Sequence, residues 1–139
     1  MNDHLIADLG RFVDERCVRL RETPGHVRVD IDRFEVWLSV LIPRAVLEWW
    51  VEAEDRVSGT RLKDCCSYDG YDAALVRELA EDMRADVVRF IENAAARPLR
   101  VVASGAVLQW NVGGEWVQAI PLVPENEDLV WNARIMRVR

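Results

Sequence analysis

The fold is decided most directly by residues 107–120, which read VLQWNVGGEWVQAI. Apolar and polar residues alternate on both sides of Gly113-Gly114, a pattern typical of a two-residue β-hairpin. The turn predicts a register in which the pairs are Val112 and Glu115, Asn111 and Trp116, Trp110 and Val117, and Gln109 and Gln118. Paired residues share a face of the hairpin. The predicted core face carries Leu108, Trp110, Val112, Val117 and Ala119, and the other face carries Gln109, Asn111, Trp116 and Gln118, with Ile120 at its end.

Outward from this hairpin, the chain alternates between helical and strand-like patterns. Apolar residues recur at helical spacing over 4–20 and 72–95. Strand patterns cover 26–31, 35–42, 45–54, 99–104 and 129–138, and a short edge strand is expected over 62–68. The stretch 35–42 is apolar on both faces, so we expect it in the centre of a sheet.

The order α-β-β-β-α-β-β-β predicts an α+β fold in a single domain, residues 1–139. We expect two helices packed on one face of a mainly antiparallel sheet of about six strands. The helices would then leave the opposite face of the sheet uncovered.

Composition restricts the class of protein and of partner. The 139 residues have a formal net charge of −6 and contain no apolar run that predicts a membrane span. The acidic balance argues against nucleic-acid binding, because basic patches supply most of that affinity. The three cysteines, Cys17, Cys65 and Cys66, lack CxxC spacing and predict free thiols in a reducing compartment. The first residues lack a signal-type segment, so we expect a cytoplasmic protein.

Six tryptophans raise the question of which rings are buried: Trp37, Trp49, Trp50, Trp110, Trp116 and Trp131. Strand alternation places Trp49 among aliphatic residues on the core side. Trp50 lies between Glu48 and Glu52 on the opposite side, and Trp37 also faces away from an all-aliphatic side. Both faces of the last strand are mixed, so the sequence does not place the sixth ring.

These faces predict a binding surface on the uncovered side of the sheet. The residues expected to bind another protein there are Trp37, Trp50, Trp116, Glu48, Glu52, Gln109 and Gln118. Aromatic residues within a polar rim have the composition of a protein–protein interface. The alternative is that a loop such as residues 55–70 folds over this face, so that the rings only pack.

The second interpretation is a small-molecule-binding protein or small enzyme with a site near Cys65, Cys66 and His26. A cysteine nucleophile needs a nearby base, and the chain has two histidines, His4 and His26. The cysteine and histidine spacings do not match a zinc site, and no phosphate or dinucleotide motif occurs. We therefore expect no cofactor, no metal and no catalytic residue.

The favoured interpretation is a non-enzymatic protein-binding module of the immunity or chaperone type. Immunity proteins that neutralise toxins, and acidic secretion chaperones, share this size, acidity and α/β mixture, which is an analogy at the level of fold and composition. An acidic surface suits a basic partner through electrostatic steering. A homodimer that pairs through the tryptophan face is the third interpretation.

Overall fold

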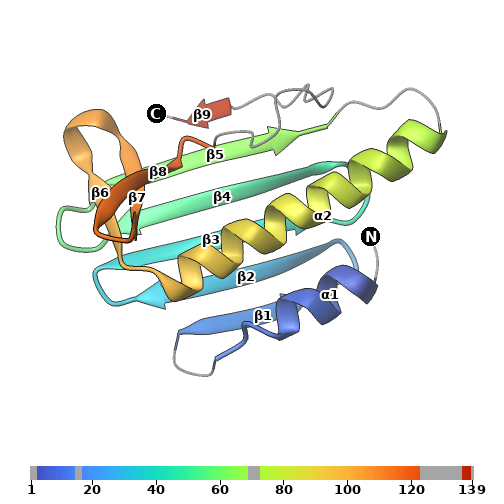
Figure 1. Cartoon of the computed structure of the whole chain (residues 1–139), viewed down its shortest axis with the longest axis horizontal. Coiled ribbons are helices and arrows are strands. Elements are labelled where there is room, and N and C mark those ends of the chain that lie inside the picture. Colours follow the sequence, from blue (N-terminus) through green and yellow to red (C-terminus); the bar gives the residue numbers. More distant parts are fainter. Residues whose placement is uncertain (1–2, 15–16, 69–72, 123–135, 139) are drawn as a thin grey trace.

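The computed structural model describes residues 3–14, 17–68, 73–122 and 136–138. These residues form an α+β fold with two α-helices and two antiparallel sheets (Figure 1). The helices are α1 (Asp3–Gly10) and α2 (Ala73–Ala96). The large sheet contains, in spatial order, β1 (Val18–Glu22), β2 (His26–Arg33), β3 (Val36–Pro43), β4 (Glu48–Asp55), β5 (Arg61–Ser67) and β9 (Met136–Val138). The small sheet contains β6 (Leu99–Val102), β7 (Val107–Val112) and β8 (Glu115–Ile120).

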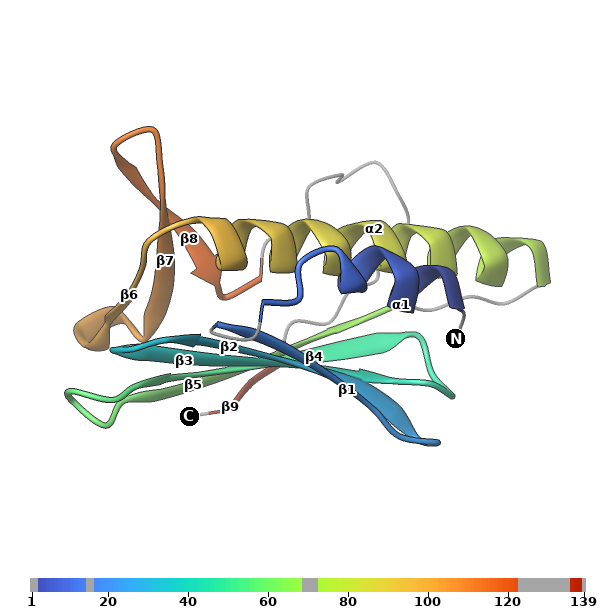
Figure 2. The same ribbon diagram turned by 90° about the horizontal axis from the view of Figure 1, so that it is seen from below.

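Alternation along the strands of the large sheet separates a buried face from an open face. The buried face carries Val27, Val29, Ile31, Val36, Leu38, Val40, Ile42, Trp49, Val51 and Ala53, each at most 4% exposed. Both helices pack on this face, and no described helix covers the other (Figure 2). Burial of a large aliphatic side chain contributes about 1.5–3 kcal/mol. A slip of one residue would expose the whole set, so the buried face fixes the register of β2, β3 and β4.

The predicted class and the placement of both helices on one face agree with the structure, but the grouping of strands differs. Five strands, β1 to β5, separate the two helices, and β6 to β8 form a separate sheet. The predicted edge strand at 62–68 corresponds to β5, which lies inside the sheet between β4 and β9. Residues 61–67 therefore extend the sheet and do not fold over its open face. Of the predicted strand 129–138, only 136–138 lie within the described residues.

The first helix is shorter than its predicted span of 4–20. It ends at Gly10, a residue type with low helix propensity. The chain then turns into β1, which pairs with β2 at the edge of the sheet. Buried Val18 is followed by exposed Arg19 and Arg21, the alternation of a half-buried strand. Apolar residues spaced three or four apart in this region therefore belong to two different elements.

The β7–β8 hairpin has the predicted register around Gly113 and Gly114, whose φ values are +60° and +94°. Positive φ at both central residues is the conformation that favours glycine in a two-residue hairpin. A bulge between Leu108 and Gln109 then shifts the pairing, so that Leu108 lies opposite Ile120. Both side chains are buried, at 0% and 2% exposed. The prediction that Ile120 ends the polar face is therefore wrong, because it does not allow for the bulge.

Aromatic packing joins the two sheets through α2. The ring of Phe90, on α2, lies 5.4 Å from Trp49 of β4 and 5.2 Å from Trp110 of β7, measured between centroids. The Trp49 contact is edge-on, an arrangement that aromatic pairs favour. The predicted core placement of Trp49 and Trp110 is consistent with these contacts, with Trp49 3% exposed and Trp110 packed on the core.

A buried hydroxyl makes a second connection between sheet and helix. Tyr68 Oη donates a hydrogen bond to Asp86 Oδ2 at 2.7 Å and accepts one from Trp49 Nε1 at 3.1 Å. Burial, together with the neighbouring Cys66 and Asp86, raises the pKa of the Tyr68 hydroxyl above its ordinary value. The hydroxyl therefore stays protonated and can donate and accept at the same time.

Replacement of Tyr68 by Phe should lower the free energy of unfolding by about 1–3 kcal/mol, because two polar groups lose a partner without water to replace it. Urea denaturation at neutral pH measures this loss. Asp86→Asn is the matched control, since an amide oxygen still accepts from the hydroxyl, and its effect should be smaller. Equal stability of Tyr68→Phe and the wild type would contradict a structural role for the hydroxyl.

Candidate functional site

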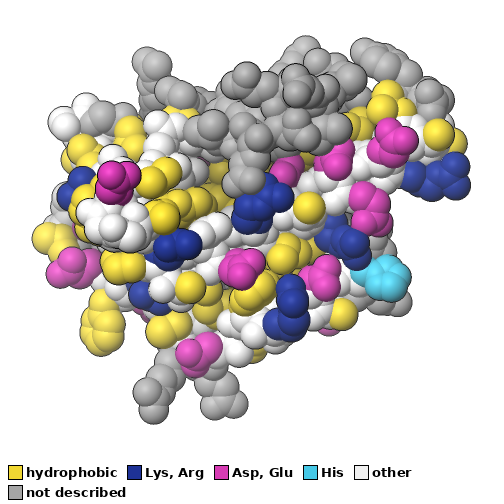
Figure 3. Space-filling model, in the orientation of Figure 1, with side chains coloured by type: hydrophobic (Ala, Val, Ile, Leu, Met, Phe, Trp, Pro, Cys, Tyr) yellow, Lys and Arg dark blue, Asp and Glu magenta, His cyan; other side chains and the backbone are white. Residues whose placement is uncertain are grey.

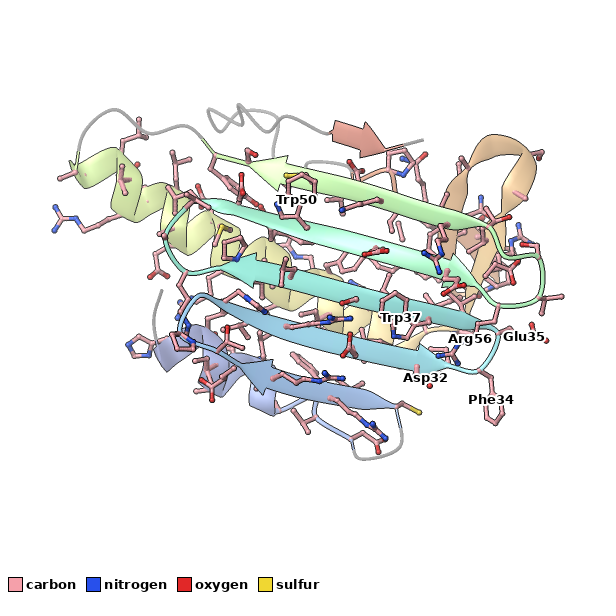
Figure 4. All side chains as sticks on the ribbon, turned by 180° about the vertical axis from the view of Figure 1, so that it is seen from behind. Asp32, Phe34, Glu35, Trp37, Trp50 and Arg56 are labelled. Carbon is pink, nitrogen blue, oxygen red and sulfur yellow. The ribbon has the colours of Figure 1, made fainter. Side chains whose placement is uncertain are left out.

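The open face of the large sheet is the surface on which most of the predicted binding residues gather. Trp37, Glu48, Trp50 and Glu52 all lie on it, on the two central strands β3 and β4. Figure 4 views this face directly and shows Trp37 and Trp50 on adjacent strands. Both rings are partly exposed, whereas the neighbouring Trp49 is buried on the opposite face. The prediction that strand alternation divides these three rings is therefore confirmed.

Trp50 borders a partly open depression of about 200 Å³ on the open face. The lining residues are Ser39, Leu41, Trp50, Glu52 and Lys63. The indole Nε1 of Trp50 donates a hydrogen bond to Glu48 Oε1 at 3.3 Å. Lys63 Nζ lies 5.4 Å from the ring centroid, within the range of a cation–π contact. These two contacts hold the ring in place while part of it stays accessible.

A polar network surrounds the second ring, Trp37. The guanidinium of Arg28 lies 5.8 Å from the Trp37 ring centroid. Arg28 Nε also donates to Asp30 Oδ1 and to Ser39 Oγ, each at 3.0 Å. Arg21 approaches the same carboxylate at 3.3 Å. The network keeps Asp30 paired although its side chain is only 11% exposed, as a nearly buried charge requires.

Charges on the open face are arranged in stripes along the strands. β4 presents Glu48, Glu52 and Glu54, and β5 places Arg61 and Lys63 beside them. Arg61 lies 3.7 Å from Glu54. Within the described part of the chain, Glu52 makes no ion pair, so its carboxylate is available at the edge of the Trp50 depression. The helix side differs, because acidic and basic side chains are interspersed over it (Figure 3).

Trp116, Gln109 and Gln118 lie on the small sheet and do not join Trp50 on one face. The small sheet rises on the helix side of the large sheet, where α2 ends (Figure 2). The three residues do share a face with one another, as the hairpin register predicts. The prediction that all the binding residues share one surface is therefore wrong for these three. Only two residues separate α2 from β6, so the small sheet begins at the end of the helix and cannot reach the open face.

Arg100 of β6 covers the Trp116 face of the small sheet. Its guanidinium lies 4.1 Å from the Trp116 ring centroid, and its Nε donates to Gln109 Oε1 at 2.8 Å. Gln118 Nε2 donates to the carbonyl of Pro121 at 2.8 Å. The polar groups of this face are thus largely used within the chain. The remaining ring, Trp131, lies outside the described residues.

The structure does not assemble the alternative site of Cys65, Cys66 and His26. His26 begins β2, three strands from β5, and three strand spacings amount to roughly 14 Å. His26 Nδ1 instead lies 3.3 Å from the hydroxyl of Thr23. Burial raises the pKa of the Cys66 thiol to about 12 and also raises that of Cys65. Both therefore remain protonated at neutral pH, which is the unreactive form.

The described residues contain neither a candidate metal cluster nor a candidate membrane-spanning helix. In that part of the chain, no group of three or more His, Cys, Asp or Glu side chains is placed to hold a metal ion. None of the described helices is both long and apolar enough to cross a membrane.

A feature that the sequence analysis missed is the tip of the β2–β3 hairpin. Phe34 there is 91% exposed and has a φ of +68°. Arg56 Nη1 donates to Asp32 Oδ1 at 2.7 Å and to the carbonyl of Phe34 at 3.1 Å. The only sign of this exposed tip in the sequence is an aromatic residue in a two-residue turn that lacks glycine and asparagine.

Comparison with known proteins gave no match to a family model, a curated protein or a solved structure. Function is therefore inferred from the surface of the chain itself.

Thiol labelling tests the placement of the cysteines. We expect iodoacetamide to modify the partly exposed Cys17 first, and Cys65 and Cys66 only after unfolding in urea, because both are fully buried with raised pKa values. Mass spectrometry of the native protein measures the labelled fraction at each site. Native Cys17→Ser protein should stay almost unlabelled, and rapid labelling of Cys65 would contradict its burial.

The Arg56–Asp32 pair should stabilise the protein in a pH-dependent way. The Arg56 hydrogen bond holds the pKa of Asp32 below its ordinary value of 3.8, so the contribution is present above that value and disappears as the pH falls through the lowered pKa. Arg56→Gln should therefore cost at most about 1 kcal/mol at pH 7, since the pair is exposed. Urea denaturation should show this difference shrinking as the pH falls below 3.8, the ordinary pKa of the carboxyl. If the difference in unfolding free energy does not change with pH, the Arg56–Asp32 pair is not its cause.

Proposed function

We propose that this protein is a non-enzymatic binding module whose open sheet face receives another protein around Trp50. The observation that carries the proposal is the depression lined by Trp50, Leu41, Ser39, Glu52 and Lys63. It combines a held aromatic ring and an aliphatic side chain with charged and hydroxyl groups at its border. Buried aromatic centres with polar rims are the usual composition of protein–protein interfaces.

The size of the depression favours a protein partner over a small molecule. Pockets that bury small ligands have volumes of roughly 300–1,000 Å³. The depression at Trp50 has about 200 Å³ and is partly open to solvent, which suits one side chain of a partner rather than an enclosed ligand. The surrounding strands offer an extended face on which the rest of the partner can lie.

Charge favours a partner with basic side chains opposite β4. Glu48, Glu52 and Glu54 form an acidic stripe on that strand, and the chain has a net charge of −6. Such a stripe accelerates the encounter with a basic protein and adds specificity. The arginines of β1 and β2 lie beyond β3, so the partner would need acidic groups on that side.

Within this proposal, the protein is of the immunity or chaperone type and works in the cytoplasm. Three free cysteines, two of them fully buried, support a reducing compartment. Trp116, Gln109 and Gln118 are not included in the proposed surface, because they lie on the small sheet. A homodimer through the open face is the competing interpretation that the experiment has to separate.

Substitution of Trp50 by Ala tests the proposed surface. We expect a loss of less than about 2 kcal/mol in unfolding free energy, since the ring is partly exposed. Trp49→Ala should lose about 3–5 kcal/mol, because that ring is in the core. Immobilised wild-type protein should capture a partner from an extract of its source organism, and calorimetry with the purified partner should show binding lost in Trp50→Ala.

Trp116→Ala is the matched control, because this ring is also partly exposed and also lies beneath a cation. It should bind the partner as the wild type does. If Trp50→Ala destabilises as strongly as Trp49→Ala, or binds the partner normally, the proposed surface is wrong. A dimer in sedimentation velocity that Trp50→Ala dissociates would identify the partner as a second copy instead.

A further inference from the structure

Phe34 combines an unfavourable backbone conformation with a side chain that is almost fully exposed. It is 91% exposed, and its φ of +68° lies in the left-handed region, which is unfavourable for a bulky residue. Phe34 is the first of two residues between β2 and β3, a position that glycine takes in type II′ hairpins. A glycine would relieve the strain, and the ring gains almost no burial. The described contacts of this chain therefore give the ring no role in folding.

Hydrogen bonds hold the Phe34 backbone in this conformation. Phe34 N donates to Asp32 Oδ1 at 3.1 Å, and Arg56 Nη1 donates to the Phe34 carbonyl at 3.1 Å. Arg56 N donates to the Glu35 carbonyl at 2.8 Å, which ties the β2–β3 tip to the β4–β5 loop. A tip fixed in this way loses less conformational entropy when a partner binds.

A second exposed apolar side chain lies in the neighbouring β4–β5 loop. Val57 is 77% exposed, and its backbone N–H donates to Asp55 Oδ1 at 3.0 Å. The two tips form one end of the large sheet. Figure 4 shows Trp37 between Phe34 and Trp50, so this end is continuous with the open face.

Charge at the tip indicates the chemistry of what Phe34 would contact. Glu35 is exposed beside Phe34, and within the described residues its carboxylate has no ion pair. Anionic membranes attract basic segments, so an acidic tip on a chain of charge −6 is unsuited to them. A protein pocket that is apolar inside and basic at its border matches both Phe34 and Glu35.

We propose that Phe34 is an anchor that inserts into an apolar pocket with a basic border on the partner protein that covers Trp50. The proposal rests on the proposed function, because it assigns both contacts to the same partner. Aromatic side chains that enter a partner pocket are often interface hot spots, where truncation weakens binding by roughly 30-fold or more. The pocket would bury the ring, and its basic side chain would pair with Glu35.

Photo-cross-linking identifies what Phe34 touches. Phe34 is replaced by p-benzoylphenylalanine, the full chain is irradiated in an extract of its source organism, and the cross-linked protein is identified by mass spectrometry. That protein, purified, is the probe for calorimetric titration against wild type, Phe34→Gly, Phe34→Ala and Trp50→Ala. Val46→Ser is the matched control, because Val46 is an exposed apolar residue in the β3–β4 connection, at the opposite end of the sheet.

We expect Phe34→Gly and Phe34→Ala to weaken binding at least 30-fold and Val46→Ser to change it less than threefold. The melting temperature of Phe34→Gly should equal that of the wild type or exceed it by a few degrees, since strain is relieved. Binding of Phe34→Gly within threefold of the wild type overturns the anchor, as does a melting temperature lowered by several degrees. If Trp50→Ala loses binding and Phe34→Gly does not, the proposed function stands without the anchor. If neither variant loses binding, both proposals fail.

Two other occupants would also overturn the proposal. Cross-linking of position 34 only to a second copy of this chain would identify a homo-oligomer, which sedimentation velocity of Phe34→Gly would check. Co-flotation with phosphatidylserine-containing vesicles that Phe34→Gly abolishes would identify a membrane surface. Absence of any cross-link at position 34, while the partner is still captured through Trp50, would place the ring outside the interface.

Discussion

The packing of α2 across one face of the large sheet is the constraint on which the rest of the structure depends. Phe90 contacts Trp49 on one side and Trp110 on the other, so one helix position holds both sheets. Most apolar side chains of β2, β3 and β4 lie on this face. The other face therefore has to be stable in water without a covering layer of described helix, and it achieves this with charged side chains paired across strands.

The main elements of the fold could be predicted because their patterns are local. The alternation in β2, β3 and β4 and the register at Gly113-Gly114 follow from neighbouring residues alone. The end of α1 could not be placed, because apolar spacing in residues 11–20 fits a helix even though β1 lies there. The strand β5 was predicted, but its position inside the sheet was not, because it depends on pairing with the distant β9. Its Asp64 is a buried carboxylate that accepts hydrogen bonds from the N–H groups of Cys65 and Leu122. Its burial depends on a segment 58 residues away.

The candidate site was predictable in part for the same reason. Alternation places Trp37, Trp50 and Glu52 on one face, and the hairpin register places Trp116 with Gln109. Neither pattern says whether two strands belong to one sheet, because that depends on contacts across α2. Phe34 escaped notice because its significance lies in a backbone angle and in the side chains that hold it, and residue types alone reveal neither.

The division of each central strand between two faces has a consequence for how the sequence of this protein can evolve. Residues of β3 and β4 that face α2 are constrained by packing, whereas their neighbours on the open face contact mainly one another and solvent. Substitutions at Leu41 or Glu52 can therefore alter the chemistry of the open face with little effect on the core. A lineage can diversify the open face on such a scaffold while the fold itself stays the same.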